Sequence, residues 1–115
     1  FDFNQAMDTF MDDKELLISL LEPYLEQVEG QLQELSGEGG LDDMDAVRGI
    51  AHSIKGSSRN LSMLELGNEA EVLEHAGRDG EKDIAAEALP RVADAFSRVR
   101  TAVLKILERE AAGPG

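Results

Sequence analysis

One histidine in this chain has neighbours that suit it for chemistry. His52 lies in a helical pattern, where residues three and four positions apart stand next to each other on the surface. Lys55 and Gly56 follow it at these two spacings, and Arg48 and Gly49 precede it. The imidazole is therefore expected to have bases on one side and open space on the other.

These neighbours suit a histidine that carries a phosphoryl group. Nearby cations disfavour a second positive charge, so we expect His52 to be largely neutral near pH 7. A neutral imidazole is a nucleophile at one ring nitrogen, and Lys55, Arg48 and Arg59 offer positive charge to a phosphoryl group. Each flanking glycine costs the helix ~1 kcal/mol relative to alanine, which indicates that space is kept for another protein's active-site loop.

The second ring nitrogen needs a partner that fixes the tautomer. Glu74 is the candidate, because it lies at the edge of the apolar face of its own predicted helix. An antiparallel neighbour would bring that edge against His52. Most single histidines on helices are ordinary surface residues, and the flanking glycines are the feature that argues against this simpler interpretation.

The composition excludes several classes of protein. The 115 residues include 11 Lys and Arg against 24 Asp and Glu, a formal net charge of −13. Nucleic acids and anionic membranes attract basic surfaces, not acidic ones. No apolar run reaches the ~18 residues of a membrane span, and the first residues do not resemble a signal peptide. The absence of cysteine excludes disulfides and Cys-ligated zinc. We expect a cytoplasmic domain that contacts neither nucleic acid nor membrane.

Helical periods account for most of the chain, and no segment shows the alternation of a β-strand. Pro23 and Pro90 are each expected to bend or interrupt a helix. Apolar spacing predicts a short helix over residues 3–11 and longer helices over about residues 12–35, 42–60, 62–77 and 83–110.

Several residues are predicted to mark the helix ends and faces. Asp12 with Glu15, and Ser62 with Glu65, have the spacing of capping boxes, and Gly77 is expected to close its helix. In the helix over residues 42–60, the histidine lies opposite an apolar face made of Val47, Ile50, Ala51, Ile54, Ser58 and Leu61.

The expected fold class is all-α. Short connections favour antiparallel neighbours, so we predict an antiparallel up-down four-helix bundle with a short extra N-terminal helix. A core poor in aromatic residues agrees with this choice. Residues 1–115 are expected to form a single monomeric domain, with the bundle over about residues 13–110.

The segment from His52 to Ser58, followed by Leu61, resembles the histidine-containing phosphotransfer (HPt) domain family of phosphorelays. The family motif is His-x-x-Lys-Gly followed by small residues, on the second main helix of a four-helix bundle. The resemblance implies that His52 carries the phosphoryl group on Nε2, that Lys55 offsets its charge, and that Gly56 permits close approach of a receiver domain.

Two further residues bear on the resemblance. Glu74 matches a glutamate in the amino-terminal phosphotransfer domain of chemotaxis histidine kinases, where it bonds the other imidazole nitrogen. The residues after Gly56 are more similar to domains found alone or at the end of hybrid sensor kinases, so chemotaxis and general phosphorelay both stay open. Ser62 stands where many family members have glycine, and we expect an altered turn there.

The resemblance implies a carrier rather than a kinase. Its phosphoryl group would come from a histidine kinase catalytic domain or a receiver aspartate, and would leave to a response-regulator receiver domain. The chain has no Gly-Lys-Ser/Thr phosphate loop, so we expect no ATP-binding or autokinase activity, no cofactor and no metal. The partner surface is expected to include Arg48, Gly49, Ser53, Ser57 and Arg59.

Four other interpretations compete with this one. A sensor-kinase dimerisation domain has an acidic residue after its histidine and a proline further on, where this chain has Ser53 and Ser57. An acyl carrier protein needs a serine where this chain has Asp43. Glu71 and His75 have a metal-ligand spacing, but no second Glu-x-x-His is present. A non-phosphorylated helical adaptor or interaction bundle would share the fold and the acidity without needing the histidine.

Overall fold

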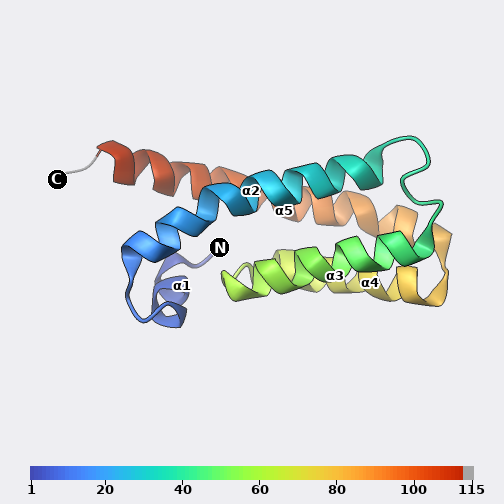
Figure 1. The fold of residues 1–115 in the computed structure, drawn as a ribbon, viewed down its shortest axis with the longest axis horizontal. Coiled ribbons are helices and arrows are strands. Elements are labelled where there is room, and N and C mark those ends of the chain that lie inside the picture. The colour runs from blue at the N-terminus through green and yellow to red at the C-terminus, as the bar shows by residue number, and fades with distance from the viewer. Residues whose placement is uncertain (113–115) are drawn as a thin grey trace.

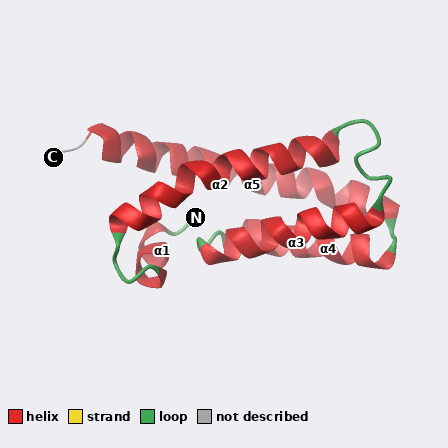
Figure 2. Ribbon diagram, viewed as in Figure 1, coloured by secondary structure: helices red, strands yellow, loops and turns green. Residues whose placement is uncertain are grey.

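The computed structural model describes residues 1–112, and within them it contains only helices and connecting loops (Figure 2). The helices are α1 (Phe3–Thr9), α2 (Lys14–Ser36), α3 (Met44–Asn60), α4 (Leu64–Asp79) and α5 (Lys82–Ala112). The four long helices run alternately up and down (Figure 1). None of the described helices is long and apolar enough to cross a bilayer. The predicted all-α bundle with a short leading helix is confirmed.

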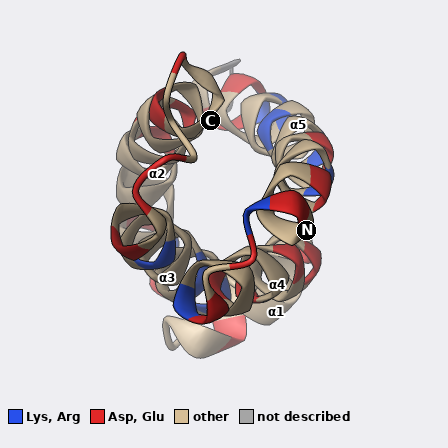
Figure 3. Cartoon of the chain, turned by 90° about the vertical axis from the view of Figure 1, so that its right-hand side faces the viewer, with Lys and Arg blue, Asp and Glu red and all other residues tan. Residues whose placement is uncertain are grey.

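The four long helices surround one core. Viewed along the bundle, they follow one another in the order α2, α3, α4 and α5, so α3 and α5 lie diagonally opposite (Figure 3). Their apolar faces meet inside the bundle, where leucine and valine predominate over aromatic side chains. The largest completely buried apolar side chains are those of Leu17, Leu21, Val28, Leu35, Val47, Ile54, Met63, Leu66, Leu73, Val92 and Val103.

Helix α3 has the bounds and the orientation that its sequence predicts. The Asp43 side chain caps the helix by accepting a hydrogen bond from the Ala46 backbone N–H at 3.1 Å. Val47 and Ile54 are completely buried, whereas the side chain of His52 is 70% exposed. The predicted apolar face is therefore confirmed, and its burial turns the histidine outward.

Helix α4 continues past Gly77, which we expected to close it. The helix runs to Asp79, and Gly77 is buried against α3. A Cβ atom at position 77 would lie 2.7 Å from the backbone nitrogen of Arg48 and 3.0 Å from the carbonyl oxygen of Met44. The glycine is a contact point between two helices, not a helix end, and only a residue without a side chain allows this approach.

The two prolines do not interrupt their helices. Both α2 and α5 continue through Pro23 and Pro90, although each proline removes one backbone donor. The first turns of α2 are inclined to the rest of the helix (Figure 1), which agrees with the bend predicted near Pro23. Packing of an apolar face over the full length of each helix outweighs the loss of one hydrogen bond.

Both predicted capping boxes are wrong. Asp13, and not Asp12, caps α2 by accepting from the Leu16 backbone N–H at 3.0 Å. Before α4, the cap position belongs to Met63, which has no side-chain cap bond. Ser62 instead has a φ of 62° and belongs to the end of α3.

The turn at Ser62 is a Schellman motif in which one residue is left-handed. The Ser62 N–H donates to the carbonyl of Arg59 at 3.1 Å, and the Met63 N–H donates to that of Ser58 at 2.8 Å. The end of α4 repeats the motif with Gly80, whose φ is 68°. Glycine enters this conformation without the steric cost that other residues incur, which explains why glycine suits the position of Ser62.

The two turns give a matched pair of substitutions. We expect Ser62→Gly to raise the free energy of unfolding by about 0.5–1 kcal/mol, because it removes the Cβ from a left-handed residue. Gly80→Ser should lower it by about 1 kcal/mol, since a Cβ there meets no atom within 4 Å and only the backbone is strained. Urea unfolding of both variants measures the effects, and a destabilised Ser62→Gly would contradict this account.

Candidate functional site

The exposed histidine shares a buried carboxylate with a lysine. Nδ1 of His52 lies 2.5 Å from Oε2 of Glu74, and Nζ of Lys55 donates to Oε1 of the same carboxylate at 2.5 Å. The Glu74 side chain is 11% exposed and that of Lys55 is 20% exposed. Because an ionised carboxylate only accepts hydrogen bonds, Nδ1 is the nitrogen that carries a proton. In the neutral form of the ring, the lone pair is then on Nε2, the nitrogen that Glu74 does not contact.

The charge of Glu74 is maintained against its burial. Burial by itself raises the pKa of this carboxyl, but the hydrogen bonds from Lys55 and His52 outweigh it and hold the pKa below its usual value. The carboxylate is therefore ionised at neutral pH. An ionised partner at Nδ1 also stabilises any positive charge that develops on the imidazole.

The three bases predicted around the histidine have different partners. Lys55 is bonded to Glu74, while the guanidinium of Arg59 is paired with Glu71 and donates to Oδ1 of Asn68 at 3.2 Å. Arg59 is therefore held on the surface of α4.

The third base, Arg48, is exposed, and it lines a surface depression together with His52. The depression has a volume of about 440 Å³, and its lining residues are Asp45, Arg48, Gly49, His52 and Glu74. Two of the three bases thus face carboxylates of α4, and the third faces solvent next to the imidazole.

The glycines on either side of the histidine face open space. A Cβ atom at Gly49 or Gly56 would meet nothing within 4 Å. In contrast, a Cβ at Gly67 would lie 2.8 Å from Cγ of Arg59, which rests on α4 there. Packing within the described chain thus accounts for Gly67 and Gly77 but not for the pair beside the histidine, although each of these costs the helix stability.

The other flank of α3 is joined to α2 by side chains that the sequence did not single out. Oγ of Ser53 accepts from Nε2 of Gln31 at 3.0 Å and of Gln27 at 3.4 Å. Oγ of Ser57 donates to the carbonyl of Ser53 at 3.0 Å. The two predicted partner-binding serines therefore lie at the α2–α3 seam, and nothing in the local sequence pairs the glutamines with them.

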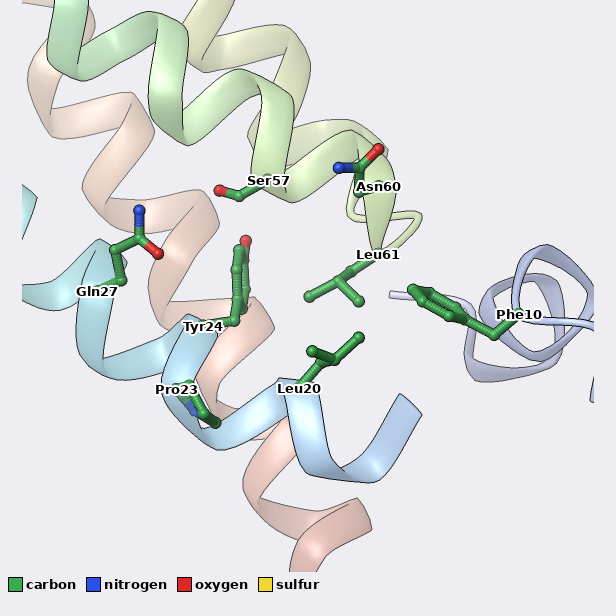
Figure 4. Close-up of a pocket in the computed structure, with 8 residues that line it drawn as sticks. All are labelled: Phe10, Leu20, Pro23, Tyr24, Gln27, Ser57, Asn60 and Leu61. Atoms are coloured by element: carbon green, nitrogen blue, oxygen red, sulfur yellow. The ribbon is translucent and has the colours of Figure 1, made fainter. Parts of the chain in front are cut away.

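An apolar groove runs from this seam toward α1. Its volume is about 440 Å³, and it is lined by Phe10, Leu20, Pro23, Tyr24, Gln27, Ser57, Asn60 and Leu61 (Figure 4). The Tyr24 hydroxyl shares a buried 2.7 Å hydrogen bond with Ser58, and burial raises the pKa of the phenol to about 12 although that bond lowers it. Sequence reasoning missed this groove, because three helices contribute to it.

The metal-ligand spacing of the second histidine leads to no larger cluster. Nε2 of His75 lies 3.7 Å from Oε1 of Glu71, on one face of α4. Over residues 1–112, no group of three or more His, Cys, Asp or Glu side chains is arranged to hold a metal ion. Glu71 is instead engaged with Arg59 of α3.

Comparison with known proteins places this site in a family. The model of the Hpt domain family matches residues 19–102, which include all of α3 and α4 and most of α2 and α5. The chain therefore belongs to the Hpt domain family, and the resemblance read from the motif is confirmed. Domains of this family carry out histidine phosphotransfer in phosphorelays, where they interact with receiver and kinase domains. Neither the curated proteins nor the solved structures yielded a match to the chain.

The lowered pKa of Glu74 predicts how its contribution to stability depends on pH. A carboxyl whose pKa is lower in the folded than in the unfolded protein stabilises the fold above the unfolded value, here 4.5, and loses this effect as pH falls through the folded value. We expect Glu74→Gln to lower the free energy of unfolding by about 1–2 kcal/mol at pH 6–7, and the difference from wild type to shrink below pH 4.5.

Urea unfolding between pH 7 and pH 3 measures this difference. Glu26→Gln, on the exposed face of α2, controls for the change of side chain. A Glu74→Gln difference that stays constant over the whole range would show that the carboxylate is not stabilised by its two partners.

Proposed function

We propose that this chain is a phosphocarrier in which His52 accepts a phosphoryl group on Nε2 and passes it to the aspartate of a receiver domain. One observation carries the proposal: Nδ1 of the exposed ring is 2.5 Å from the ionised Glu74. This contact fixes the tautomer that leaves a nucleophilic lone pair on Nε2. Membership of the Hpt domain family supports the same chemistry.

The proposed reaction moves the phosphoryl group between two oxygens by way of the imidazole. The Nε2 lone pair forms the N–P bond while the bond from phosphorus to the donor oxygen breaks, and that oxygen keeps the electron pair. The ring becomes positively charged, and the carboxylate of Glu74 stabilises this charge through the Nδ1 proton. Return of the phosphoryl group to a carboxylate oxygen of the receiver reverses each of these changes.

The donor is proposed to be another domain, because the chain has no phosphate-binding loop for ATP. A histidine kinase catalytic domain or a phosphorylated receiver aspartate has the necessary high-energy phosphoryl group. Which of them is the donor fixes the direction of phosphate flow.

The proposed docking surface is centred on the two glycines of α3 that face open space. Ser53 and Ser57 lie beside them toward α2, and the apolar groove continues the surface toward α1 (Figure 4). Arg48 and Arg59 are at the opposite edge of α3. A surface that is apolar at one end and polar at its rim is typical of protein interfaces. The bare helix backbone at Gly49 and Gly56 gives a receiver's active-site loop access to the imidazole.

Phosphoryl transfer tests the proposed acceptor. We expect the wild-type chain, incubated with a histidine kinase and ATP or with a phosphorylated receiver, to acquire acid-labile, base-stable phosphate. His52→Gln should acquire none, whereas His75→Gln should be labelled like wild type. A labelled His52→Gln protein would place the acceptor elsewhere. Absence of label on the folded wild type across a panel of partners would favour the adaptor interpretation.

A bulky residue in the open space beside the histidine tests the docking surface. We expect Gly56→Gln to slow transfer from a phosphorylated receiver at least tenfold while the bundle stays folded, since a Cβ there meets no atom of the chain. Ser97→Gln, at an exposed position of the diagonally opposite α5, is the matched control. Circular dichroism checks the fold of both, and normal transfer by Gly56→Gln would exclude this surface from docking.

A further inference from the structure

The three bases near the histidine are not equally available to a phosphoryl group. Lys55 donates to Glu74 at 2.5 Å, and Arg59 is paired with Glu71. Each of these cations already has a carboxylate from α4 that neutralises it. Each still has N–H donors to spare, but its charge is already offset by that carboxylate, so it attracts a phosphoryl oxygen less strongly than an unpaired cation does.

Release of Lys55 would have a direct cost at the site. The Glu74 side chain is only 11% exposed, and burial acts to raise its pKa while the Lys55 hydrogen bond opposes that effect. Without the lysine, the carboxylate would lose part of what keeps it ionised. This ionised carboxylate orients the imidazole. Lys55 therefore supports the site more by remaining bonded to Glu74 than by moving to a phosphoryl oxygen.

Arg48 is not paired with a carboxylate of α4 in the described part of the chain. It is exposed, and it has no ion pair within 4.0 Å among residues 1–112. It lies four residues before His52, so the two side chains are neighbours on one helix face. Both line the same depression of about 440 Å³. The base and the reactive ring thus share one open space.

The backbone of Arg48 also lies at a close contact between α3 and α4. A Cβ atom at Gly77 would lie 2.7 Å from the Arg48 nitrogen and 2.9 Å from its Cα, so α4 packs directly against this residue. The main chain is therefore held on the α4 side while the side chain is free toward solvent. The guanidinium of an arginine whose backbone is held in this way presents a planar set of N–H donors that matches two phosphoryl oxygens.

We propose that Arg48 is the residue that binds the phosphoryl group on His52, and that Lys55 is a positioning residue that acts through Glu74. This assignment rests on the proposed function of the histidine and names the group that holds its product. The other charged groups at the depression are the carboxylates of Asp45 on α3 and Glu74 on α4. Arg48 is the cation among the lining residues of this depression, and it can offset the charge of a phosphoryl dianion beside these carboxylates.

The test loads the phosphoryl group chemically, so that no partner protein is needed. In a His75→Gln background, His52 is the only histidine, and phosphoramidate phosphorylates histidine directly. The ³¹P resonance then reports the pKa of the phosphoryl group, which a bound cation lowers. The variants to compare are Arg48→Gln, Lys55→Gln and, as an exposed arginine of α5 without an ion pair in the described chain, Arg100→Gln.

We expect Arg48→Gln to raise the phosphoryl pKa by about half a unit, roughly a threefold change in the protonation constant, and Arg100→Gln to leave it unchanged. Lys55→Gln should change it less than Arg48→Gln does and should instead alter the ¹⁵N signals of the imidazole. The Nε–H resonance of Arg48 should move on phosphorylation, and that of Arg100 should not.

Two results would overturn the assignment: a phosphoryl pKa that Arg48→Gln leaves unchanged, or a larger change with Lys55→Gln than with Arg48→Gln. The first would exclude Arg48 as the phosphoryl ligand, and the second would make Lys55 the ligand. Failure of the proposed function would be recognised by a different result. No kinase or receiver would transfer a phosphoryl group to the chain, although the chemically phosphorylated protein would give the titration described here.

Discussion

The carboxylate of Glu74 is the interaction on which the site depends. It is buried, it is charged, and it contacts two side chains that come from a different helix. An unpaired charge in that position would be strongly unfavourable. The carboxylate is tolerated because Lys55 and His52 both donate to it, and in return it fixes the orientation of an otherwise exposed ring. One buried ion thus links the stability of the α3–α4 pair to the reactivity of the histidine.

This linkage is accompanied by a close approach of α3 and α4. Gly77 allows the two backbones to come into contact at Arg48, and Gly67 allows the side chain of Arg59 to pack against α4. The glycines of α3 and α4 therefore have two opposite uses. Those of α4 bring helices of the same chain together, whereas Gly49 and Gly56 of α3 leave a surface bare. The first use fixes the geometry of the site, and the second keeps it accessible.

The features that depend on local sequence could be predicted. The Asp43 cap and the apolar face of α3 are set by spacing along one helix, so the outward position of His52 followed from the sequence. The contact with Glu74 was also anticipated, because an edge position on an antiparallel neighbour brings it to the ring.

Other features, most of them contacts between helices, could not be predicted from spacing along one helix. Gly77 has the sequence appearance of a helix end, and only its distance to Arg48 shows that it is a packing contact. Ser62 has the spacing of an N-cap, but its N–H donates to the carbonyl of Arg59, so it belongs to the turn that ends α3. The bonds of Gln27 and Gln31 to α3 join residues more than 20 positions apart, so no local pattern reveals them.

The short separation of the reactive residues along the chain has a consequence for how the domain folds and moves. His52 and Glu74 are 22 positions apart, within one helical hairpin closed by the turn at Ser62. Closing so short a loop loses little chain entropy, and contacts of low sequence separation form early in folding. The hairpin is also the most closely packed pair of the bundle. Four of the eight residues that line the apolar groove belong to α2. Local opening at α2 would therefore change the surface proposed for the partner, while His52 and Glu74 would stay together within the α3–α4 hairpin.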